Sequence, residues 1–324
     1  MKNKKIIRWA LEYGIVLVLV LLVVFFAVKN QRFLTVNVLM TVLKQVAITG
    51  IVSIGMTYVM ITGGIDLSVG SIAGLTGIIS SMLMLNGTNT VLACAAGLAA
   101  ALLLGAFNAV LITRAGLPPL IATLGVMTSA RGLAFIISGG FSVVNFNPNF
   151  TKFSTSTLWF IPYPVILMAV LFLIAAFILN QMKMGRYLYG VGSNEEAARL
   201  SGIATHRVKS FAYMFSGLLA GIAGLLYLSR IGSGQAGAGD GYEMDAITAV
   251  VLGGVSISGG EGRLGMVLIG VLIMGVLSTG MVMMNVNDYI QQVVKGLVLI
   301  GAVAFSIYSK RIRGGMLQEG EETA

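Results

Sequence analysis

Residues 184–203, MGRYLYGVGSNEEAARLSGI, form the longest polar and charged run inside a chain that is otherwise mostly apolar. Ser193 and Glu196 fit a capping box, in which a hydroxyl and a carboxylate satisfy free backbone donors at a helix start. Gly202 can adopt the left-handed conformation that ends a helix. The pattern therefore predicts a short polar helix between two apolar blocks.

The amino-acid composition indicates that those apolar blocks lie in a lipid membrane. Of the 324 residues, 57% are hydrophobic and only 10% are charged, and the mean hydropathy is +0.93. Apolar runs of roughly twenty residues recur along the chain, and each can cross a hydrocarbon core about 30 Å thick. The sequence therefore predicts an all-α polytopic protein in contact with membrane lipid, with one transmembrane domain over residues 1–324.

Glycine, proline, asparagine and charged residues break the apolar sequence into about ten predicted transmembrane helices. The polar loop 183–209 separates the sixth from the seventh, and residues 310–324 form a polar tail. The predicted spans are 11–28, 44–62, 67–85, 90–113, 120–138, 158–179, 210–228, 244–258, 264–284 and 289–309.

The basic residues predict the orientation of these spans. The net charge of +9 is not spread along one solvated face, so it does not indicate nucleic-acid binding. Lysine and arginine are enriched in cytoplasmic loops, and this rule places both termini in the cytoplasm, although Lys29 and Arg32 then lie on the outer side. The basic residues on the predicted inner side are Lys2, Lys4, Lys5, Arg8, Arg114, Lys183, Arg186, Arg199, Arg207, Lys209, Arg263, Lys310, Arg311 and Arg313.

Two segments far apart in the chain resemble each other. In residues 57–68 and in residues 248–258, an apolar span ends in a Gly-Gly pair that an alternation of apolar and polar residues follows. Paired glycine-broken segments in the two halves of a transporter mark discontinuous helices at its pathway. The pattern favours a transport function, although chance similarity in a glycine-rich chain explains it equally well.

Several kinds of chemistry are missing from the sequence. The chain has no Gly-Lys dipeptide and therefore no phosphate-binding P-loop for ATP hydrolysis. His206 is the only histidine and Cys94 the only cysteine, which excludes the usual zinc, haem and thiol-nucleophile arrangements. We therefore expect no catalytic residues, no metal site and no cofactor bound by this chain.

Two charged residues, Asp66 and Arg131, lie inside apolar segments. A charge in lipid costs several kcal/mol unless it is paired or hydrated, so both should face the interior of the bundle. Each either serves the substrate pathway or has a structural role, Asp66 as a helix cap and Arg131 as an anchor that binds carbonyl groups. With them, the predicted pathway and gate residues are Gln45, Asp66, Ser68, Asn108, Thr128, Arg131 and Ser256.

Four motifs carry a family resemblance: MITGGIDLSVGS at 60–71, TLGVMTSARGLAFIISGG at 123–140, YGVGSNEEAARLSGI at 189–203 and VLGGVSISGGEGR at 251–263. In this order they resemble the permease subunits of ABC transporters that import monosaccharides, and most closely the ribose permease family. The likeness covers about residues 33–311. It implies a type II ABC importer fold in the bacterial inner membrane, and a ribose-like pentose or related sugar as substrate.

The same resemblance implies partners and a coupling site. The partners would be an ABC ATPase that carries ATP and magnesium, an extracytoplasmic sugar-binding protein and a second permease copy. The residues that would couple the chain to the ATPase are Ser193, Glu195, Glu196, Ala197, Ala198 and Gly202.

Alternative functions remain open at this stage. A branched-chain amino-acid permease shares the superfamily, and Asp66 and Arg131 could then bind a zwitterion. A self-sufficient secondary carrier or channel is disfavoured, because acidic residues for ion coupling are scarce in the spans.

Overall fold

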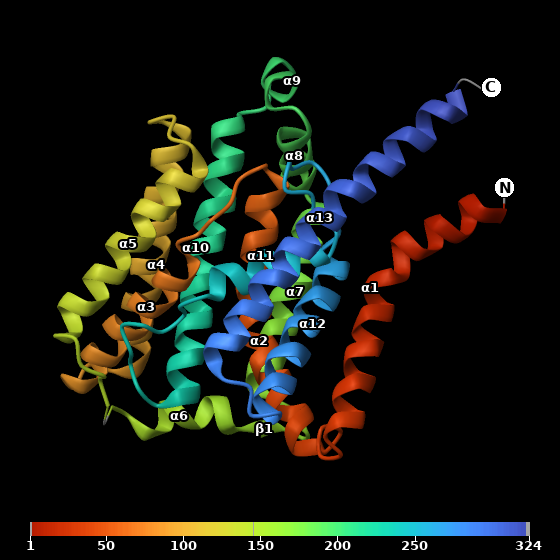
Figure 1. Ribbon diagram of the computed structural model, residues 1–324. Coiled ribbons are helices and arrows are strands. Elements are labelled where there is room, and N and C mark those ends of the chain that lie inside the picture. The colour runs from red at the N-terminus through yellow and green to blue at the C-terminus, as the bar shows by residue number, and fades with distance from the viewer. Residues whose placement is uncertain (1, 145, 322–324) are drawn as a thin grey trace.

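In the computed structural model, which describes residues 2–144 and 146–321, the chain folds into a bundle of helices with one short hairpin (Figure 1). The elements are α1 (Lys2–Lys29), α2 (Val36–Ile61), α3 (Val69–Leu85), α4 (Thr90–Thr113), α5 (Pro119–Ser138), α6 (Pro148–Thr155), β1 (Thr157–Leu158), β2 (Ile161–Pro162), α7 (Tyr163–Gln181), α8 (Lys183–Ser193), α9 (Glu195–Leu200), α10 (Thr205–Ile231), α11 (Tyr242–Leu252), α12 (Leu264–Met283) and α13 (Asp288–Glu321).

Seven of the described helices are long and apolar enough to cross a membrane: α2, α4, α5, α7, α10, α12 and residues Asp288–Tyr308 of α13. The apolar part of α1, Gly14–Lys29, is shorter, as is α3, and α11 has only 11 residues. The structure thus confirms an all-helical polytopic membrane protein. Each of the ten predicted spans overlaps a helix, and seven of these helices meet the length and hydropathy that a crossing requires.

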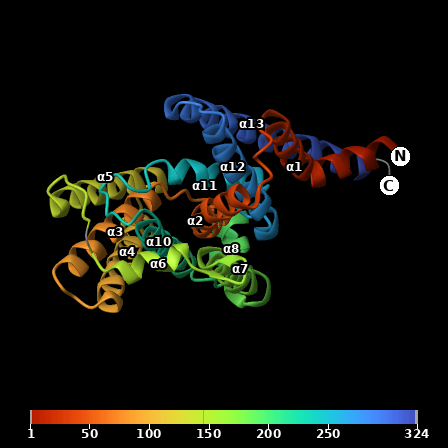
Figure 2. The same cartoon turned by 90° about the horizontal axis from the view of Figure 1, so that it is seen from below.

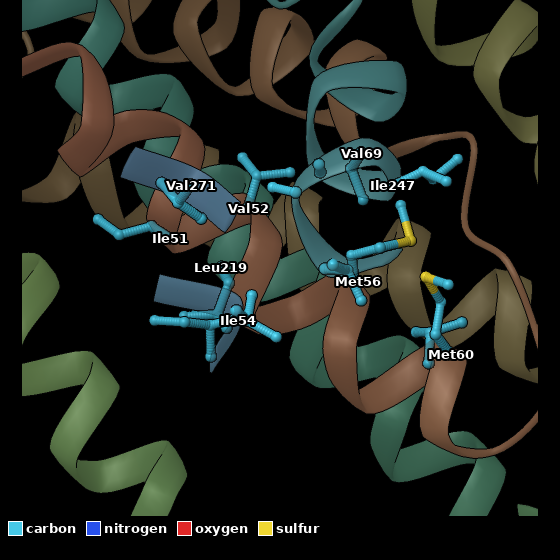
Figure 3. Close-up of a cluster of buried hydrophobic side chains, with 14 of the residues drawn as sticks. Ile51, Val52, Ile54, Met56, Met60, Val69, Leu219, Ile247 and Val271 are labelled. Atoms are coloured by element: carbon cyan, nitrogen blue, oxygen red, sulfur yellow. The ribbon is translucent and has the colours of Figure 1, made fainter. Parts of the chain in front are cut away.

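The core is built around α2, in which every residue from Val46 to Ile61 is buried. A helix that is apolar on all sides packs on all sides, and α2 contacts α7, α10, α11 and α12. Figure 3 shows this packing, with Ile51 and Val52 of α2 near Val271 of α12, and Ile54 beside Leu219 of α10. Seen from below, α3, α4 and α5 lie on one side of the bundle, and α1 stands at its edge beside α12 (Figure 2).

Several predicted span boundaries differ from the observed helix ends. The span predicted at 244–258 corresponds to α11, which ends at Leu252 because a turn at Gly253 and Gly254 follows it. The second helix begins at Val36 instead of residue 44, because the amphipathic stretch before the apolar run continues the same helix. The sixth begins at Tyr163 instead of residue 158, because residues 157–162 form the β1–β2 hairpin. Pro164 sits in the first turn of α7, where the missing N–H of proline costs nothing.

Two irregular segments, 62–68 and 232–241, lie inside the bundle. The first joins α2 to α3, and the second returns from the end of α10 to the start of α11 (Figure 1). The second segment packs on the start of α3, which follows the first segment: Gly70 of α3 lies so close to Gly239 that a Cβ on either glycine would overlap the other's carbonyl oxygen. Irregular backbone at membrane depth is tolerated only where protein or water satisfies its polar groups. The neighbours of these two segments therefore indicate candidate functional residues.

Candidate functional site

The polar loop 183–209 contains two helices, α8 and α9, at one end of the bundle. In Figure 1, α9 projects beyond the ends of the long helices, on the side toward which the N-terminal part of α1 and the C-terminal part of α13 also extend. Figure 1 places α6 and the hairpin at the opposite end. The chain therefore presents one short, exposed helix on the same side as its terminal segments.

The residue that caps α9 is Asn194, so the predicted capping box of Ser193 and Glu196 is wrong. The Asn194 side chain accepts a hydrogen bond from the backbone N–H of Ala197 at 2.9 Å. Ser193 is still helical, as the last residue of α8, and its hydroxyl donates to the carbonyl of Tyr189 at 2.9 Å. Asn194 takes the extended backbone conformation that an N-cap requires, and asparagine caps as well as serine does.

Gly202 ends α9 as predicted, with a φ of +82°. Its N–H donates to the carbonyl of Arg199 at 3.0 Å, and the N–H of Ile203 donates to the carbonyl of Ala198 at 3.1 Å. This pair of bonds is the Schellman motif. Because a cap at each end satisfies part of its free backbone groups, we expect α9 to be rigid despite its six residues.

The surface of α9 combines charge with one apolar side chain. Glu195 forms an ion pair with Lys209 of α10, and Glu196 pairs with Arg199 at 2.7 Å within α9. Ala197 is exposed, but Ala198 is buried, so a docking partner would not touch the Ala198 side chain. Leu200 is 79% exposed. Leu200 was not among the predicted coupling residues, and it is the large apolar side chain that α9 exposes.

The amphipathic helix α8 connects α9 to the rest of the bundle. Its Tyr189 hydroxyl donates to the carbonyl of Gly262, in the segment between α11 and α12, at 2.8 Å. Burial raises the pKa of Tyr189, although the nearby Arg263 acts in the opposite direction. The hydroxyl therefore keeps its proton at neutral pH and remains a donor in this contact.

Asp66 lies in segment 62–68, fully buried, at the centre of a polar cluster. One carboxylate oxygen accepts from the Ser68 hydroxyl at 2.6 Å and from the Ser68 N–H at 3.0 Å. The other oxygen accepts from the hydroxyl of Ser216, on α10, at 2.9 Å. Asn108 of α4 donates to the Ser68 hydroxyl at 2.8 Å. The structure thus brings together three predicted pathway residues, Asp66, Ser68 and Asn108, and adds Ser216.

The Asp66 cluster ties segment 62–68 to α4 and α10. Within the described residues, the Asn108 carbonyl oxygen and the buried hydroxyl of Tyr213 have no hydrogen-bond partner. No basic side chain pairs with Asp66 among these residues, so its carboxyl group is held by hydroxyl and N–H donors alone. Leaving one of these buried polar groups without its partner would cost about 1–3 kcal/mol, which makes this cluster a strong local constraint.

Arg131 of α5 ties segment 232–241 to a neighbouring helix, as the Asp66 cluster does for segment 62–68. One guanidinium nitrogen donates to the carbonyls of Ala236 and Ala238, each at 2.9 Å. A second nitrogen lies 3.7 Å from the carboxylate of Asp240. On the other side, Gly74 of α3 leaves room for the same two carbonyls. These contacts match the structural role that was one of the two predicted for Arg131, an anchor that binds carbonyl groups.

The remaining predicted pathway residues lie apart. Gln45 accepts from Arg230 of α10 at 2.7 Å, and the Ser256 hydroxyl accepts from the Ser258 N–H at 3.3 Å. The exposed Thr128 bonds only to carbonyls of its own helix, α5, among the described residues. Two cavities of about 630 and 540 Å³ lie elsewhere, and no predicted pathway residue lines either of them.

A further charged pair was not considered in the sequence analysis. Lys295 of α13 donates to the carboxylate of Asp245, on α11, at 2.8 Å. Asp245 is buried, and it joins a short helix to a long one. Both residues interrupt apolar runs in the sequence, which is the signal that could have identified them.

The described part of the chain contains no group of three or more His, Cys, Asp or Glu side chains that could hold a metal ion. The polar clusters are built from carboxylates, hydroxyls, amides and guanidinium groups that already bind one another. The arrangement can hold irregular backbone in place and present a docking helix.

The comparisons with known proteins agree with this architecture. The family described as "Branched-chain amino acid transport system / permease component" matches residues 38–303. The ribose import permease protein of Escherichia coli strain K12 is 39% identical over 302 residues, which are 91% of this chain and 93% of that protein. The Bacillus subtilis strain 168 protein of the same name is 42% identical over 294 residues, or 90% and 91%.

A relative named for another sugar is also similar. The D-allose transport system permease protein of Escherichia coli strain K12 is 36% identical over 307 residues, 93% of this chain and 94% of that protein. No solved structure matches the chain. The matches and the apolar helices together show a multi-pass protein of the inner membrane.

Proposed function

Because this chain belongs to the family of branched-chain amino acid transport system permease components, we propose that it is the membrane-spanning subunit of an ABC importer for a monosaccharide. The observation that carries the proposal is the rigid, exposed helix α9 on an otherwise membrane-embedded bundle. A permease without a phosphate-binding loop needs an ATPase partner, and α9 is the part of this chain that such a partner can grip. ATP and magnesium would be bound by that partner.

The relatives favour a sugar over a branched-chain amino acid. They are named for ribose and D-allose, and a further one, 35% identical over 94% of this chain, for L-arabinose. The two charges that could have bound a zwitterion are occupied, Asp66 by hydroxyl donors and Arg131 by carbonyl groups. We therefore propose a ribose-like pentose or a related neutral sugar as the substrate.

The proposed topology has about ten crossings with both termini in the cytoplasm. Three helices beyond the seven long ones, α1, α3 and α11, would complete the count. The terminal segments extend toward the same end as α9, and the basic residues of the polar loop 183–209 lie at that end as well. This arrangement agrees with the positive-inside rule.

In the proposed coupling site, Glu195, Glu196, Ala197 and Leu200 face the ATPase, and Ser193, Ala198 and Gly202 support α9 from below. Leu200 would supply an apolar contact to the ATPase, and the charged residues of α9 would lie around it. Because Glu195 and Glu196 already pair with Lys209 and Arg199, docking would rearrange charges that are present at the surface.

The proposed sugar path follows the face of α5 and segment 232–241, where a second permease copy would complete it. Thr128 is exposed there, Arg131 is partly exposed, and Asp240 is 86% exposed. A carboxylate with that exposure is not stable against lipid, so we propose that this face meets water or a second copy. Asp66, Ser68 and Asn108 would act from behind as a fixed frame, and Gln45 and Ser256 would serve as gate residues. An extracytoplasmic sugar-binding protein would deliver the substrate.

Gly202→Val tests the coupling site. Valine is strained at a φ of +82°, so the end of α9 should unwind, and the ATPase should no longer co-purify with the permease. Gly87→Val is a matched control, because Gly87 has a φ of +83° and, like Gly202, open space around it among the described residues, but it lies in the turn between α3 and α4.

The measurement is co-purification of the ATPase from membranes, together with sugar uptake. Loss of both in Gly202→Val, with retention in Gly87→Val, supports the proposal. Full retention and uptake in Gly202→Val would show that α9 is only a connection between α8 and α10.

A further inference from the structure

Three glycine-containing backbone segments meet where α8 leads into α9. They are the end of α2 at Ile61, the end of α8 at Gly192, and the turn at Gly259 and Gly260 between α11 and α12. We call this meeting point the glycine junction. Its first bond runs from the N–H of Gly260 to the carbonyl of Ile61 at 2.9 Å, and it joins the first of the two similar glycine-broken segments, 57–68, to the turn that directly follows the second, 248–258.

Gly192 lies directly against that bond. A Cβ atom on Gly192 would overlap the carbonyl oxygen of Ile61 and would lie 2.6 Å from the amide nitrogen of Gly260. Both neighbours are backbone atoms that already bind each other, so neither can yield as a flexible side chain would. Only glycine therefore allows α8 to rest on both broken segments at once.

The turn at Gly259 and Gly260 is equally close to α8. A Cβ on Gly259 would lie 2.7 Å from the nitrogen of Gly63 and 2.9 Å from the carbonyl oxygen of Gly192. A Cβ on Gly260 would lie 2.8 Å from the Cα of Ser193. Both glycines have positive φ angles, +84° and +75°. The Tyr189 hydroxyl adds a side-chain bond from α8 to the carbonyl of Gly262.

We propose that Gly192 is a positioning residue that transmits movement of α8 and α9 into both glycine-broken segments of the permease. The inference rests on the proposed function, and it adds the internal step that follows docking of the ATPase. The contact consists of backbone atoms with no intervening side chains. A displacement of α8 therefore reaches Ile61 and Gly260 directly, because no side chain can absorb it by changing its rotamer.

The junction would also let two breaks far apart in the chain respond together. The carbonyl of Ile61 stands at the end of the central helix α2, five residues before Asp66. Gly260 stands four residues before α12. One movement of α8 would therefore act on the central helix and on the segment between α11 and α12, two of the helices that pack on α2.

Gly192→Ala tests this proposal, with Gly190→Ala as the matched control. Both glycines lie in α8, and alanine raises helix propensity equally at each. A Cβ on Gly190 would meet only the end of the Ile203 side chain, at 4.0 Å, among the described residues. Each variant is reconstituted in proteoliposomes with the ATPase and the sugar-binding protein of the proposed importer. The probe is whichever of ribose, allose and arabinose the parent importer takes up.

For Gly192→Ala we expect the ATPase to remain bound and its basal ATP hydrolysis to stay within twofold of the parent. The stimulation of hydrolysis by the sugar-loaded binding protein should be lost, and uptake should fall at least tenfold. Gly190→Ala should match the parent in every measurement. Normal stimulation and uptake in Gly192→Ala would overturn the proposal.

Tyr189→Phe provides a second test that adds no volume. It removes the bond to the Gly262 carbonyl and should reduce stimulation several-fold, with basal hydrolysis and the amount of permease unchanged. If the amount of permease falls but the ratio of stimulated to basal hydrolysis stays normal, the junction is only structural and the proposal is wrong. A failure of the proposed function looks different, because the parent itself would then neither retain the ATPase nor take up any of the three sugars.

Discussion

The two irregular segments inside the bundle, 62–68 and 232–241, are stabilised by opposite means. In segment 62–68, the carboxylate of Asp66 accepts hydrogen bonds from the side chains of Ser68 and Ser216. In segment 232–241, the carbonyls of Ala236 and Ala238 accept from Arg131, a cation on a neighbouring helix. Each irregular segment therefore has one ionisable side chain that organises it.

The difference between the segments lies in their access to solvent. Asp66 is completely buried, whereas the Arg131 side chain is 21% exposed and that of Asp240 is 86% exposed. Water can replace a lost hydrogen bond in segment 232–241 but not around Asp66. We therefore expect segment 62–68 to be a fixed frame and segment 232–241 to be the adaptable side of the permease.

Asp66→Ala should have the largest effect on stability. It leaves two hydroxyls and one N–H without their acceptor, at about 1.5–3 kcal/mol for each bond to an ionised group. Removal of a buried charge offsets part of this loss, so we expect a net destabilisation of about 2–4 kcal/mol. The measurement is thermal unfolding of the purified permease in detergent, together with its amount in the membrane.

Asp66→Asn is the control for shape, because it keeps one acceptor oxygen in place. It should lose clearly less stability than Asp66→Ala. An unchanged unfolding temperature in Asp66→Ala would show that the cluster is not a frame, and a pathway role for Asp66 would become the better interpretation.

Arg131→Ala should have an intermediate and more local effect. It removes the donor from the carbonyls of Ala236 and Ala238, beside the exposed Asp240, which costs about 1–2 kcal/mol. Since 1.4 kcal/mol corresponds to a factor of ten, amides of segment 232–241 should exchange hydrogen about tenfold faster, and those of 62–68 should not change. Arg131→Lys retains a charged donor and should show a smaller increase. Equal acceleration in both segments would contradict the distinction between them.

The sequence predicted the fold class, the polar helix and both glycine breaks, because each has a local signal. Apolar runs indicate membrane helices, and the Gly-Gly pairs at 63–64 and 253–254 follow helix ends. Gly202 was predicted as a helix end for the same reason. Local signals failed at the start of α9, because two neighbouring residues, Ser193 and Asn194, both favour the N-cap position. The sequence does not show which of them takes the non-helical conformation of a cap.

The partners of the charged residues could not be predicted, because they depend on packing between distant helices. Ser216 lies 150 residues from Asp66, and the carbonyl of Ala236 lies 105 residues from Arg131. A backbone carbonyl, moreover, leaves no trace in the sequence as a binding partner. The approach of Gly192 to Ile61 is hidden in the same way, since 42 glycines do not indicate which ones touch.

Asp240→Asn should have the smallest effect, and it identifies which contact of Arg131 holds segment 232–241. The guanidinium nitrogen lies 3.7 Å from the Asp240 carboxylate, longer than the 2.7–2.9 Å typical of a charged hydrogen bond. Exposed pairs of this kind contribute about 0–1 kcal/mol. We therefore expect less than a threefold change in hydrogen exchange across the segment.

Hydrogen exchange measured at low and at high salt distinguishes the ion pair of Arg131 with Asp240 from its hydrogen bonds to carbonyl groups. Salt screens exposed charges, with a Debye length of about 3 Å at 1 M, but it leaves hydrogen bonds to carbonyl groups largely intact. Exchange in the parent should therefore be insensitive to salt if Arg131 acts through Ala236 and Ala238. If Asp240→Asn and 1 M salt each accelerate exchange as much as Arg131→Ala does, the ion pair holds the segment. The two irregular segments would then both depend on a carboxylate, and the contrast between them would be one of burial alone.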